Sequence, residues 1–306
     1  MIHIGDCREI LPTLPAESVD CVVTSPPYYM LRNYGVDGQI GVETTTEEYI
    51  SEMVNVFREV RRVLKKNGTL WLNIGDTYSG SGNGGETINP KYQKLTPDQK
   101  VHKKTLELPA KNMFGIPWRV ALALQGDGWI LRQDIIWSKP NPMPESISDR
   151  CTKSHEYIFL FSKSKRYYFD NEAIAEPVTG TKPSKPSSSR YGGKKYTEHS
   201  DKFFRTKSGN LYIPRETRNK RDVWVIPTEQ RKEAHFATFP YKLAETCILA
   251  GCPEGGTVLD PFIGSGTVGK VSLDNNRDYV GIELNPEYAA IAHSYIGDTK
   301  QYPLEV

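Results

Sequence analysis

The sequence has few cysteines, and they are not arranged as a disulfide framework or a zinc site would require. No Cys-x-x-Cys pair occurs, and the one close pair is not followed by a His-x-x-x-His motif; the five are Cys7, Cys21, Cys151, Cys247 and Cys252. Scattered thiols of this kind are typical of proteins that stay reduced. The pattern therefore argues against a disulfide-stapled secreted scaffold and against a Cys-rich zinc module, and we expect no metal.

Long apolar runs are missing as well. Hydrophobic residues make up 38% of the 306 residues, and no run approaches the roughly 20 residues that a membrane-spanning helix needs. The segment from Met1 to Asp6 does not have the pattern of a signal peptide. We therefore expect a soluble, cytoplasmic protein without a membrane partner. Its length is sufficient for one large core, or for a core with an inserted lobe.

An excess of charge of one sign is absent from the chain as a whole, whose net charge is +2. Residues 163–222 are the exception, because they hold fifteen Lys and Arg against seven Asp and Glu, with aromatic residues between them. A basic, aromatic segment with little periodicity suits a phosphate backbone and base edges. A solvated insertion without a ligand is the alternative, and the net negative charge of the remaining residues favours nucleic acid.

One motif follows a short apolar segment, residues 19–23, which predicts a buried strand. The strand ends at Ser25-Pro26-Pro27-Tyr28. Proline donates no backbone hydrogen bond and has a fixed φ, so the carbonyls here are held in place and can accept from a ligand. With a hydroxyl before them and an aromatic ring after them, they suit a flat heterocycle that carries an exocyclic amino group. A proline-rich turn that only closes a strand is the alternative.

A second motif joins a strand, a glycine loop, a helix and another strand over residues 257–283. Gly264 and Gly266 allow a tight turn and close approach to a ligand. Glu283 lies 17 residues after Gly266, about where a dinucleotide fold places the carboxylate that binds ribose hydroxyls. Asp260 stands where an anionic phosphate would lie, which favours S-adenosylmethionine over an NAD-type ligand.

The order of strands and helices predicts an α/β fold with a largely parallel sheet. Lys65-Lys66-Asn67-Gly68 is typical of a helix end. Residues 79–104 have low apolar content and predict a surface loop. The expected strands span residues 2–4, 19–23, 69–74, 129–137, 155–162, 257–260 and 279–283.

Together the two motifs resemble those of the β-class DNA amino-methyltransferases. The resemblance implies a Rossmann-like, mostly parallel seven-stranded sheet with helices on both faces, in circularly permuted order. It further implies a catalytic half over residues 1–162, a small irregular target-recognition lobe over 163–222 and a cofactor-binding half over 223–306.

The resemblance also implies the site residues. The catalytic residues would be Ser25, Pro26, Pro27 and Tyr28. The cofactor would contact Asp6, Thr24, His235, Phe239, Pro240, Asp260, Pro261, Phe262, Gly264, Ser265, Gly266, Thr267 and Glu283. DNA would contact Lys139, Asn141, Lys194, Lys195, Arg205 and Arg218, although Lys139 and Asn141 equally fit a purely structural loop.

The implied activity is transfer of a methyl group from S-adenosylmethionine to an exocyclic amino nitrogen of a base flipped out of double-stranded DNA. The Ser-Pro-Pro-Tyr form favours cytosine N4 over adenine N6. RNA or protein methylation, and a non-enzymatic DNA-binding module, are the other classes considered. A separately encoded restriction endonuclease is a candidate partner, and the sequence leaves monomer and homodimer open.

Overall fold

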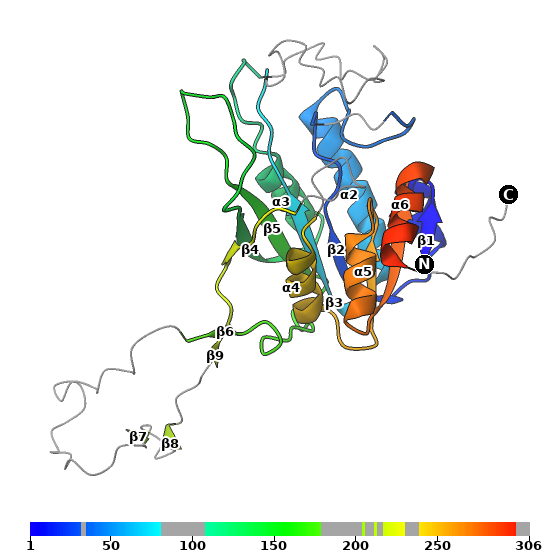
Figure 1. Ribbon diagram of the computed structural model, residues 1–306. Coiled ribbons are helices and arrows are strands. Elements are labelled where there is room, and N and C mark those ends of the chain that lie inside the picture. The colour runs from blue at the N-terminus through cyan, green and yellow to red at the C-terminus, as the bar shows by residue number, and fades with distance from the viewer. Residues whose placement is uncertain are drawn as a thin grey trace, which may run out of the picture. The chain divides into compact units, whose positions relative to one another are not determined.

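The computed structural model describes residues 1–31, 35–80, 108–178, 204–205, 211–212, 217–229 and 239–297. Their contacts divide the chain into two compact units, of which the first comprises Met1–Asp170 and Asp222–Val306 and the second Asn171–Arg221. The first unit contains the sheet, the helices and every residue of the site described below (Figure 1).

A mixed sheet forms the centre of the first unit. In the described residues it has eight strands, in the order β1-β12-β11-β2-β3-β5-β4-β10. All run in one direction except β5, which is antiparallel to both neighbours. The bounds are β1 Ile2–Ile4, β2 Val19–Thr24, β3 Leu64–Ile74, β4 Ile130–Ser138, β5 His155–Ser162, β10 Val223–Val225, β11 Thr257–Asp260 and β12 Asp278–Glu283.

The expectation of a mostly parallel sheet is therefore confirmed, but seven strands was one too few. The additional strand is β10, a three-residue edge strand that pairs in parallel with β4. Only its central residue, Trp224, is buried, while Val223 and Val225 are exposed. So short a segment contains too few residues to establish a strand pattern, and its pairing with β4 defines it.

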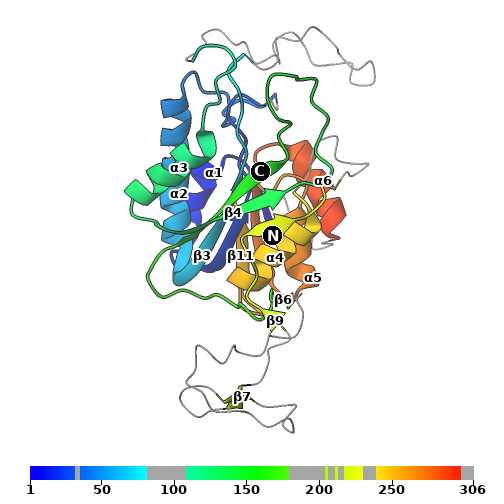
Figure 2. The same cartoon turned by 90° about the vertical axis from the view of Figure 1, so that its left-hand side faces the viewer.

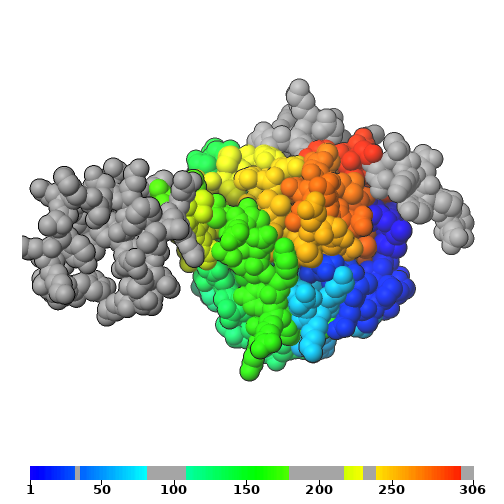
Figure 3. All heavy atoms as spheres, turned by 90° about the horizontal axis from the view of Figure 1, so that it is seen from below, coloured from blue at the N-terminus to red at the C-terminus, as the bar shows by residue number. Residues whose placement is uncertain are grey.

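Helices cover both faces of the sheet (Figure 2). On one face lie α1 Cys7–Ile10, α2 Thr46–Val63 and α3 Ile116–Gly126, with a 3-10 turn at Leu11–Thr13; on the other lie α4 Tyr241–Gly251, α5 Thr267–Asp274 and α6 Pro286–Ile296. Segments far apart in the sequence adjoin, because β11 lies between β12 and β2. The early and late parts of the chain accordingly meet on the surface, as the blue and orange atoms show (Figure 3).

Helix α2 is stabilised both by its local sequence and by packing of its buried face. Thr45 caps it, accepting from the Glu48 N–H while the Glu48 carboxylate accepts from the Thr45 N–H, a reciprocal arrangement that satisfies two donors. Its buried face repeats every three or four residues, as at Met53, Phe57 and Val60. Each such side chain contributes about 1.5–3 kcal/mol on full burial.

The expected end of this helix was wrong. The helix stops at Val63 and the chain enters β3 at once, so Lys65-Lys66-Asn67-Gly68 lies within the strand. Pairing with β2 overrides the local signal, and a register shift between Val19 and Cys21 accommodates the segment. Gly68 is needed there because a Cβ would lie 2.8 Å from the Asp20 carbonyl oxygen.

The second unit has two small antiparallel pairs in its described residues. Strand β6 (Glu176–Pro177) pairs with β9 (Thr217–Arg218), and β7 (Phe204–Arg205) pairs with β8 (Leu211–Tyr212). Most of the expected 79–104 loop lies outside the described residues. Among the helices of the described ranges, none has the length and apolar content to cross a membrane.

Candidate active site

Two loops begin side by side at one edge of the sheet. Strands β2 and β11 are parallel neighbours, with Val258 opposite Cys21 and Leu259 opposite Val22. Their last residues are joined, because the Thr24 hydroxyl donates to Asp260 Oδ1 at 2.6 Å and both side chains are buried. The loop after β2 and the loop after β11 therefore start from one shared hydrogen bond, at the edge where α/β sheets bind ligands.

The loop after β11 is held by its backbone. Pro261, Thr267 and Gly266 are buried, whereas Phe262, Gly264 and Ser265 are partly exposed. Gly264 and Gly266 have φ of +52° and +87°, values that favour glycine. At Gly266 a Cβ would also lie 3.0 Å from Cα of Ala292, so glycine lets α5 start close against α6.

Glu283, at the end of β12, braces the same loop. Its Oε2 accepts from the Gly264 N–H at 3.0 Å and its Oε1 from the Asn285 N–H at 2.8 Å. A carboxylate has about four acceptor positions, so both oxygens retain capacity toward a ligand's hydroxyl groups. The structure thus brings Glu283, Gly264 and Asp260 together.

The two carboxylic acids are electrostatically unusual. Burial raises the pKa of Asp260 to about 7, against the lowering effect of the bonds from Thr24 and the Phe262 N–H. Burial also raises the pKa of Glu283, against the lowering effect of the backbone N–H groups of Asn285, Gly264 and Leu284. No Lys or Arg lies between Asp260 and Thr267. Two acids beside a loop that has no Lys or Arg of its own suit a ligand with hydroxyl groups and positive charge, and do not suit a pyrophosphate.

The loop after β2 is held by side chains. Pro26 is buried, and Ser25, Pro27 and Tyr28 are partly exposed. The Tyr49 hydroxyl donates to the Pro27 carbonyl at 2.9 Å. No donor to the Pro26 carbonyl occurs in the part of the chain that the structure describes. That carbonyl and the Ser25 hydroxyl are the acceptors that the loop offers.

Three residues that the sequence did not single out surround Tyr28. Its hydroxyl donates toward Glu156 Oε2 at 2.8 Å and Asn73 Oδ1 at 3.2 Å, and the Ser25 hydroxyl donates to it at 3.3 Å. One face of the ring lies on Gly75, where a Cβ would be 2.6 Å from Tyr28 Cε2. Burial and the Glu156 carboxylate raise the pKa of Tyr28 well above its usual value.

Strand direction explains how Glu156 reaches this site. Because β5 is antiparallel, its first residues lie at the edge where β3 and β4 end, with Glu156 opposite Trp137 of β4. Lys139 follows β4 and forms an ion pair with Glu156. To place Glu156 near Tyr28 from the sequence, one would have to know that β5 is antiparallel. Neither the periodicity nor the motifs indicate strand direction.

Asp6 lies at the start of α1 and is engaged by Arg8. Its Oδ1 caps the helix through the Arg8 N–H at 2.8 Å, and the Arg8 guanidinium binds both oxygens. Burial opposes ionisation of Asp6, but the bonds to Arg8 and its charge outweigh this effect and lower the pKa. A ligand at Asp6 must therefore share the carboxylate with Arg8.

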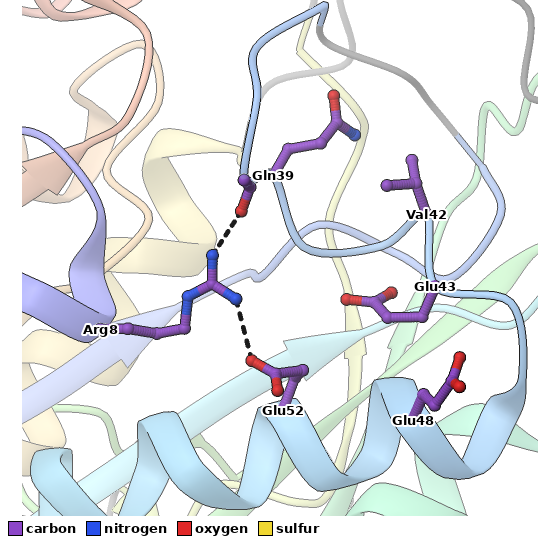
Figure 4. A pocket seen from close by; sticks show the side chains of 7 residues that line it. Arg8, Gln39, Val42, Glu43, Glu48 and Glu52 are labelled. Atoms are coloured by element: carbon purple, nitrogen blue, oxygen red, sulfur yellow. Dashed lines mark hydrogen bonds and ion pairs between the residues drawn. The ribbon is translucent and has the colours of Figure 1, made fainter.

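Arg8 also lines an open pocket of about 340 Å³ (Figure 4). Its guanidinium lies between the Gly38 carbonyl and Glu52 of α2, at 2.6 and 3.0 Å. Burial raises the pKa of Glu43 on the far side of this pocket. The remaining lining residues are Gln39, Val42 and Glu48, so the pocket is acidic, and the sequence did not indicate it.

Comparisons with known proteins place the chain. The N6/N4 methylase family, described as DNA methylase, matches residues 19–294. Type II methyltransferase M.SmaI of Serratia marcescens is 47% identical over 297 residues, which cover 96% of this chain and 90% of that protein. The chain belongs to the DNA methylase family.

Two solved structures share the fold of this methylase. PvuII DNA methyltransferase (cytosine-N4-specific) superposes with a TM-score of 0.63 at 21% identity, over 98% of this chain and 87% of that one. A putative DNA modification methylase of Thermus thermophilus, complexed with S-adenosyl-L-methionine, gives 0.59 at 25% identity, over 97% and 92%. These similarities confirm the expected α/β fold with a mostly parallel sheet and helices.

Three of the candidate DNA contacts of the methylase are engaged by other residues of the chain. The Lys139 side chain is 17% exposed and is paired with Glu156. Asn141 exchanges hydrogen bonds with the Thr228 backbone. Arg218 in the second unit binds Glu176 at 2.7 Å. All three therefore have partners within the chain.

The structure describes only some of the remaining expected residues. Phe239 is partly exposed, and Pro240 is the buried N-cap of α4. Only the backbone of Arg205 is described, in β7. His235, Lys194 and Lys195 lie outside the described residues.

Proposed function

We propose that this DNA methylase transfers a methyl group from S-adenosylmethionine to the exocyclic amino nitrogen of a base flipped out of double-stranded DNA, and that the base is cytosine, methylated at N4. Transfer to adenine N6 is the second candidate, because the Ser-Pro-Pro-Tyr motif resembles the cytosine enzymes without being exclusive to them.

One observation carries the proposal. The hydrogen bond from Thr24 to Asp260, 2.6 Å long, ties the loop of Ser25 to the loop of Gly264 and Gly266. A donor molecule held by one loop and an acceptor base held by the other would therefore meet at a fixed place. Such positioning replaces an encounter of two reactants in solution and is worth several kcal/mol of barrier.

The residues at the loop after β11 fit S-adenosylmethionine. Glu283 has acceptor capacity for ribose hydroxyls, and Asp260 and Glu283 suit its positive charge. The loop has no cation for a phosphate, and the family is one of methylases. When bound, this cofactor supplies a methyl group that its positively charged sulfur has activated for transfer. Thr24, Pro261, Phe262, Ser265, Thr267, Phe239, Pro240 and His235 remain candidates for the wall of its site, and Asp6 for the adenine.

The residues of the loop after β2 fit an amino group. An exocyclic amino nitrogen is conjugated with its ring, so its lone pair is a weak nucleophile. The Ser25 hydroxyl oxygen and the Pro26 carbonyl accept its two hydrogens, which localises the lone pair and stabilises the positive charge that develops on nitrogen. Tyr28, a partly exposed residue, stacks against the base, a contact worth about 1–3 kcal/mol by comparison with single-strand binders.

DNA is the substrate that the composition supports best. Residues 163–222 carry the positive excess and the interleaved aromatic side chains, which suit target recognition, and a base must leave the duplex to reach Ser25. Lys139, Asn141, Lys194, Lys195, Arg205 and Arg218 remain candidate DNA contacts within this proposal. A separately encoded endonuclease remains a candidate partner.

Nucleoside mass spectrometry tests the proposal. The pure protein is incubated with unmethylated duplex DNA and S-adenosylmethionine, and the DNA is digested. N4-methylcytosine is the expected product. N6-methyladenine would leave the proposed site intact but change the target base from cytosine to adenine. The absence of both products would contradict the proposed methylation of DNA. RNA and protein substrates in the same assay test the other substrate classes.

A further inference from the structure

Glu156 is the end of a hydrogen-bond chain that starts at Ser25. The Ser25 hydroxyl donates to the Tyr28 hydroxyl at 3.3 Å, and the Tyr28 hydroxyl reaches Glu156 Oε2 at 2.8 Å. Lys139 forms an ion pair with the other oxygen of the same carboxylate. Both members of this pair are largely buried, with side chains 17% and 15% exposed, so the negative charge is compensated within the protein.

The direction of every bond in this chain is determined. An ionised carboxylate accepts only, so Tyr28 must donate to Glu156. Asn73 imposes the same direction, because its amide nitrogen faces Glu156 Oε2 and the Tyr157 carbonyl, at 3.2 and 3.1 Å, which turns its oxygen toward Tyr28. Since Tyr28 has a single hydroxyl proton and both inner partners are acceptors, that hydroxyl can only accept from Ser25.

The direction of these hydrogen bonds determines what Ser25 offers to the substrate. With its proton committed to Tyr28, the Ser25 oxygen presents only lone pairs outward. A hydroxyl without such a partner can turn its proton toward the base, where it would oppose an N–H group. We propose that Glu156, held by Lys139 and Asn73, is a positioning residue that fixes Ser25 as a hydrogen-bond acceptor for the amino group of the target base. This inference rests on the proposed function.

The same arrangement brings negative charge toward the reacting nitrogen. Hydrogen bonds that end on a charge are stronger than neutral ones, and chains of hydrogen bonds polarise one another. A polarised Ser25 oxygen is the better acceptor for an amino group that becomes positive during transfer. Glu156 therefore acts through Tyr28 and Ser25 without touching the base.

Glu156→Gln is the sharpest test, because the side chain keeps its shape but loses its negative charge. The carboxylate, which only accepts hydrogen bonds, is replaced by an amide that can also donate. A Gln amide can donate to Tyr28, and the carboxylate that binds both the Tyr28 hydroxyl and the Asn73 amide nitrogen is lost. The Tyr28 proton is then no longer committed to the inner partners and can point to Ser25, which turns the Ser25 proton outward. We expect the single-turnover rate of methylation to fall about 10- to 100-fold, with the dissociation constants of S-adenosylmethionine and DNA within about twofold of the wild type.

Asp20→Asn is the matched control. Asp20 is 13% exposed, pairs with Lys65 at 2.9 Å and lies near the start of β2, the strand that ends at Thr24. It has the same burial and the same kind of partner as Glu156, at the opposite end of the sheet. We expect this variant to methylate at the wild-type rate, whatever it loses in thermal stability.

A double-mutant cycle separates a positioning role from a structural one. If Glu156 acts through Ser25, Glu156→Gln should have no further effect on rate in a Ser25→Ala background. An equal fold loss in both backgrounds would overturn the proposal, and so would a wild-type rate for Glu156→Gln. Should Glu156→Gln fail to fold, Tyr28→Phe cuts the same chain and should also add nothing to Ser25→Ala.

A second readout needs no turnover. Tyrosine labelled with ¹³C at Cζ reports ionisation of Tyr28 in the free protein, with Tyr28→Phe identifying the signal. We expect the pKa of Tyr28 to fall in Glu156→Gln, and an unchanged titration would contradict the hydrogen-bond chain. If the wild type produces no methylated base, the proposed function fails, while this titration still decides the direction of the chain.

Discussion

The two loops at the sheet edge are built by opposite means. The loop after β11 is shaped by its own backbone, through glycines with positive φ and N–H groups that meet Glu283. The loop after β2 is shaped by side chains from distant strands, with Tyr28 fixed by Asn73 and Glu156. In the proposed function, the loop after β11 holds a cofactor that is the same in every turnover, and the loop after β2 orients a reacting group. This difference predicts that changes in the loop after β11 alter affinity and that changes in the loop after β2 alter rate.

Ser25→Ala should produce the largest effect and affect only the rate. Removing an acceptor at developing charge costs about 10²–10³-fold in turnover by analogy with loss of an oxyanion-hole donor. Affinity for S-adenosylmethionine should stay near the wild-type value, because Ser25 belongs to the other loop. Single-turnover methylation and isothermal titration calorimetry measure the two quantities. Turnover equal to that of the wild type would remove Ser25 from the mechanism.

Glu283→Ala should produce the reverse, a loss of affinity. A hydrogen bond to a charged group is worth about 1.5–3 kcal/mol, so we expect S-adenosylmethionine to bind about 10- to 100-fold more weakly. At saturating cofactor, turnover should recover most of its wild-type value. Glu283→Gln, which retains one acceptor oxygen, is the milder control. A dissociation constant unaltered by calorimetry would show that Glu283 does not bind the ribose.

Gly75→Ala examines the support of Tyr28. The new Cβ would lie 2.6 Å from the ring, so the ring must move and its hydroxyl must shift from Glu156. We expect turnover to fall about tenfold, since misplacement by about 1 Å can cost up to 10²-fold, while cofactor affinity is unchanged. Gly126→Ala is the control, because no neighbour lies within 4 Å of its Cβ position and alanine favours a helix. Equal rates for both variants would contradict the role of the Tyr28 ring.

The sequence predicts the loop after β11 far better than the loop after β2. Strand β11, the glycine loop, α5 and β12 are contiguous, so their signals lie within residues 257–283 and the structure reproduces them closely. Asn73 reaches Tyr28 through the parallel pairing of β2 and β3, whereas Glu156 reaches it only because β5 is antiparallel to β3. Strand direction is decided by tertiary packing, and no local pattern in the sequence specifies it.

The same difference between local signals and long-range pairing explains the errors in the predicted fold. Lys65-Lys66-Asn67-Gly68 carries a strong local signal for a helix end, yet pairing with β2 draws it into β3. Strand β10 carries almost no local signal and exists because β4 offers a free edge. Where local and long-range interactions agree, as along the buried face of α2, the sequence suffices.

Asp260→Asn should change how the stability of the folded state depends on pH. The folded state holds a proton on Asp260 up to about pH 7, whereas the usual pKa of an aspartic acid is 3.8. Between these values the folded state binds more protons than the unfolded state, so this group makes stability fall as pH rises. Its slope is at most about 1.4 kcal/mol per pH unit.

Thermal unfolding midpoints of the cofactor-free protein between about pH 4 and pH 7 measure this slope. Because Glu283 and other acids titrate as well, the informative quantity is the difference between the wild type and Asp260→Asn. We expect the variant to gain stability relative to the wild type as pH rises through that window, and the cofactor-loop geometry explains the sign: the carboxyl is buried with two donors and no cation. Parallel curves would mean that Asp260 is ionised throughout, and that the hydrogen bond from Thr24 joins the loops through a charge.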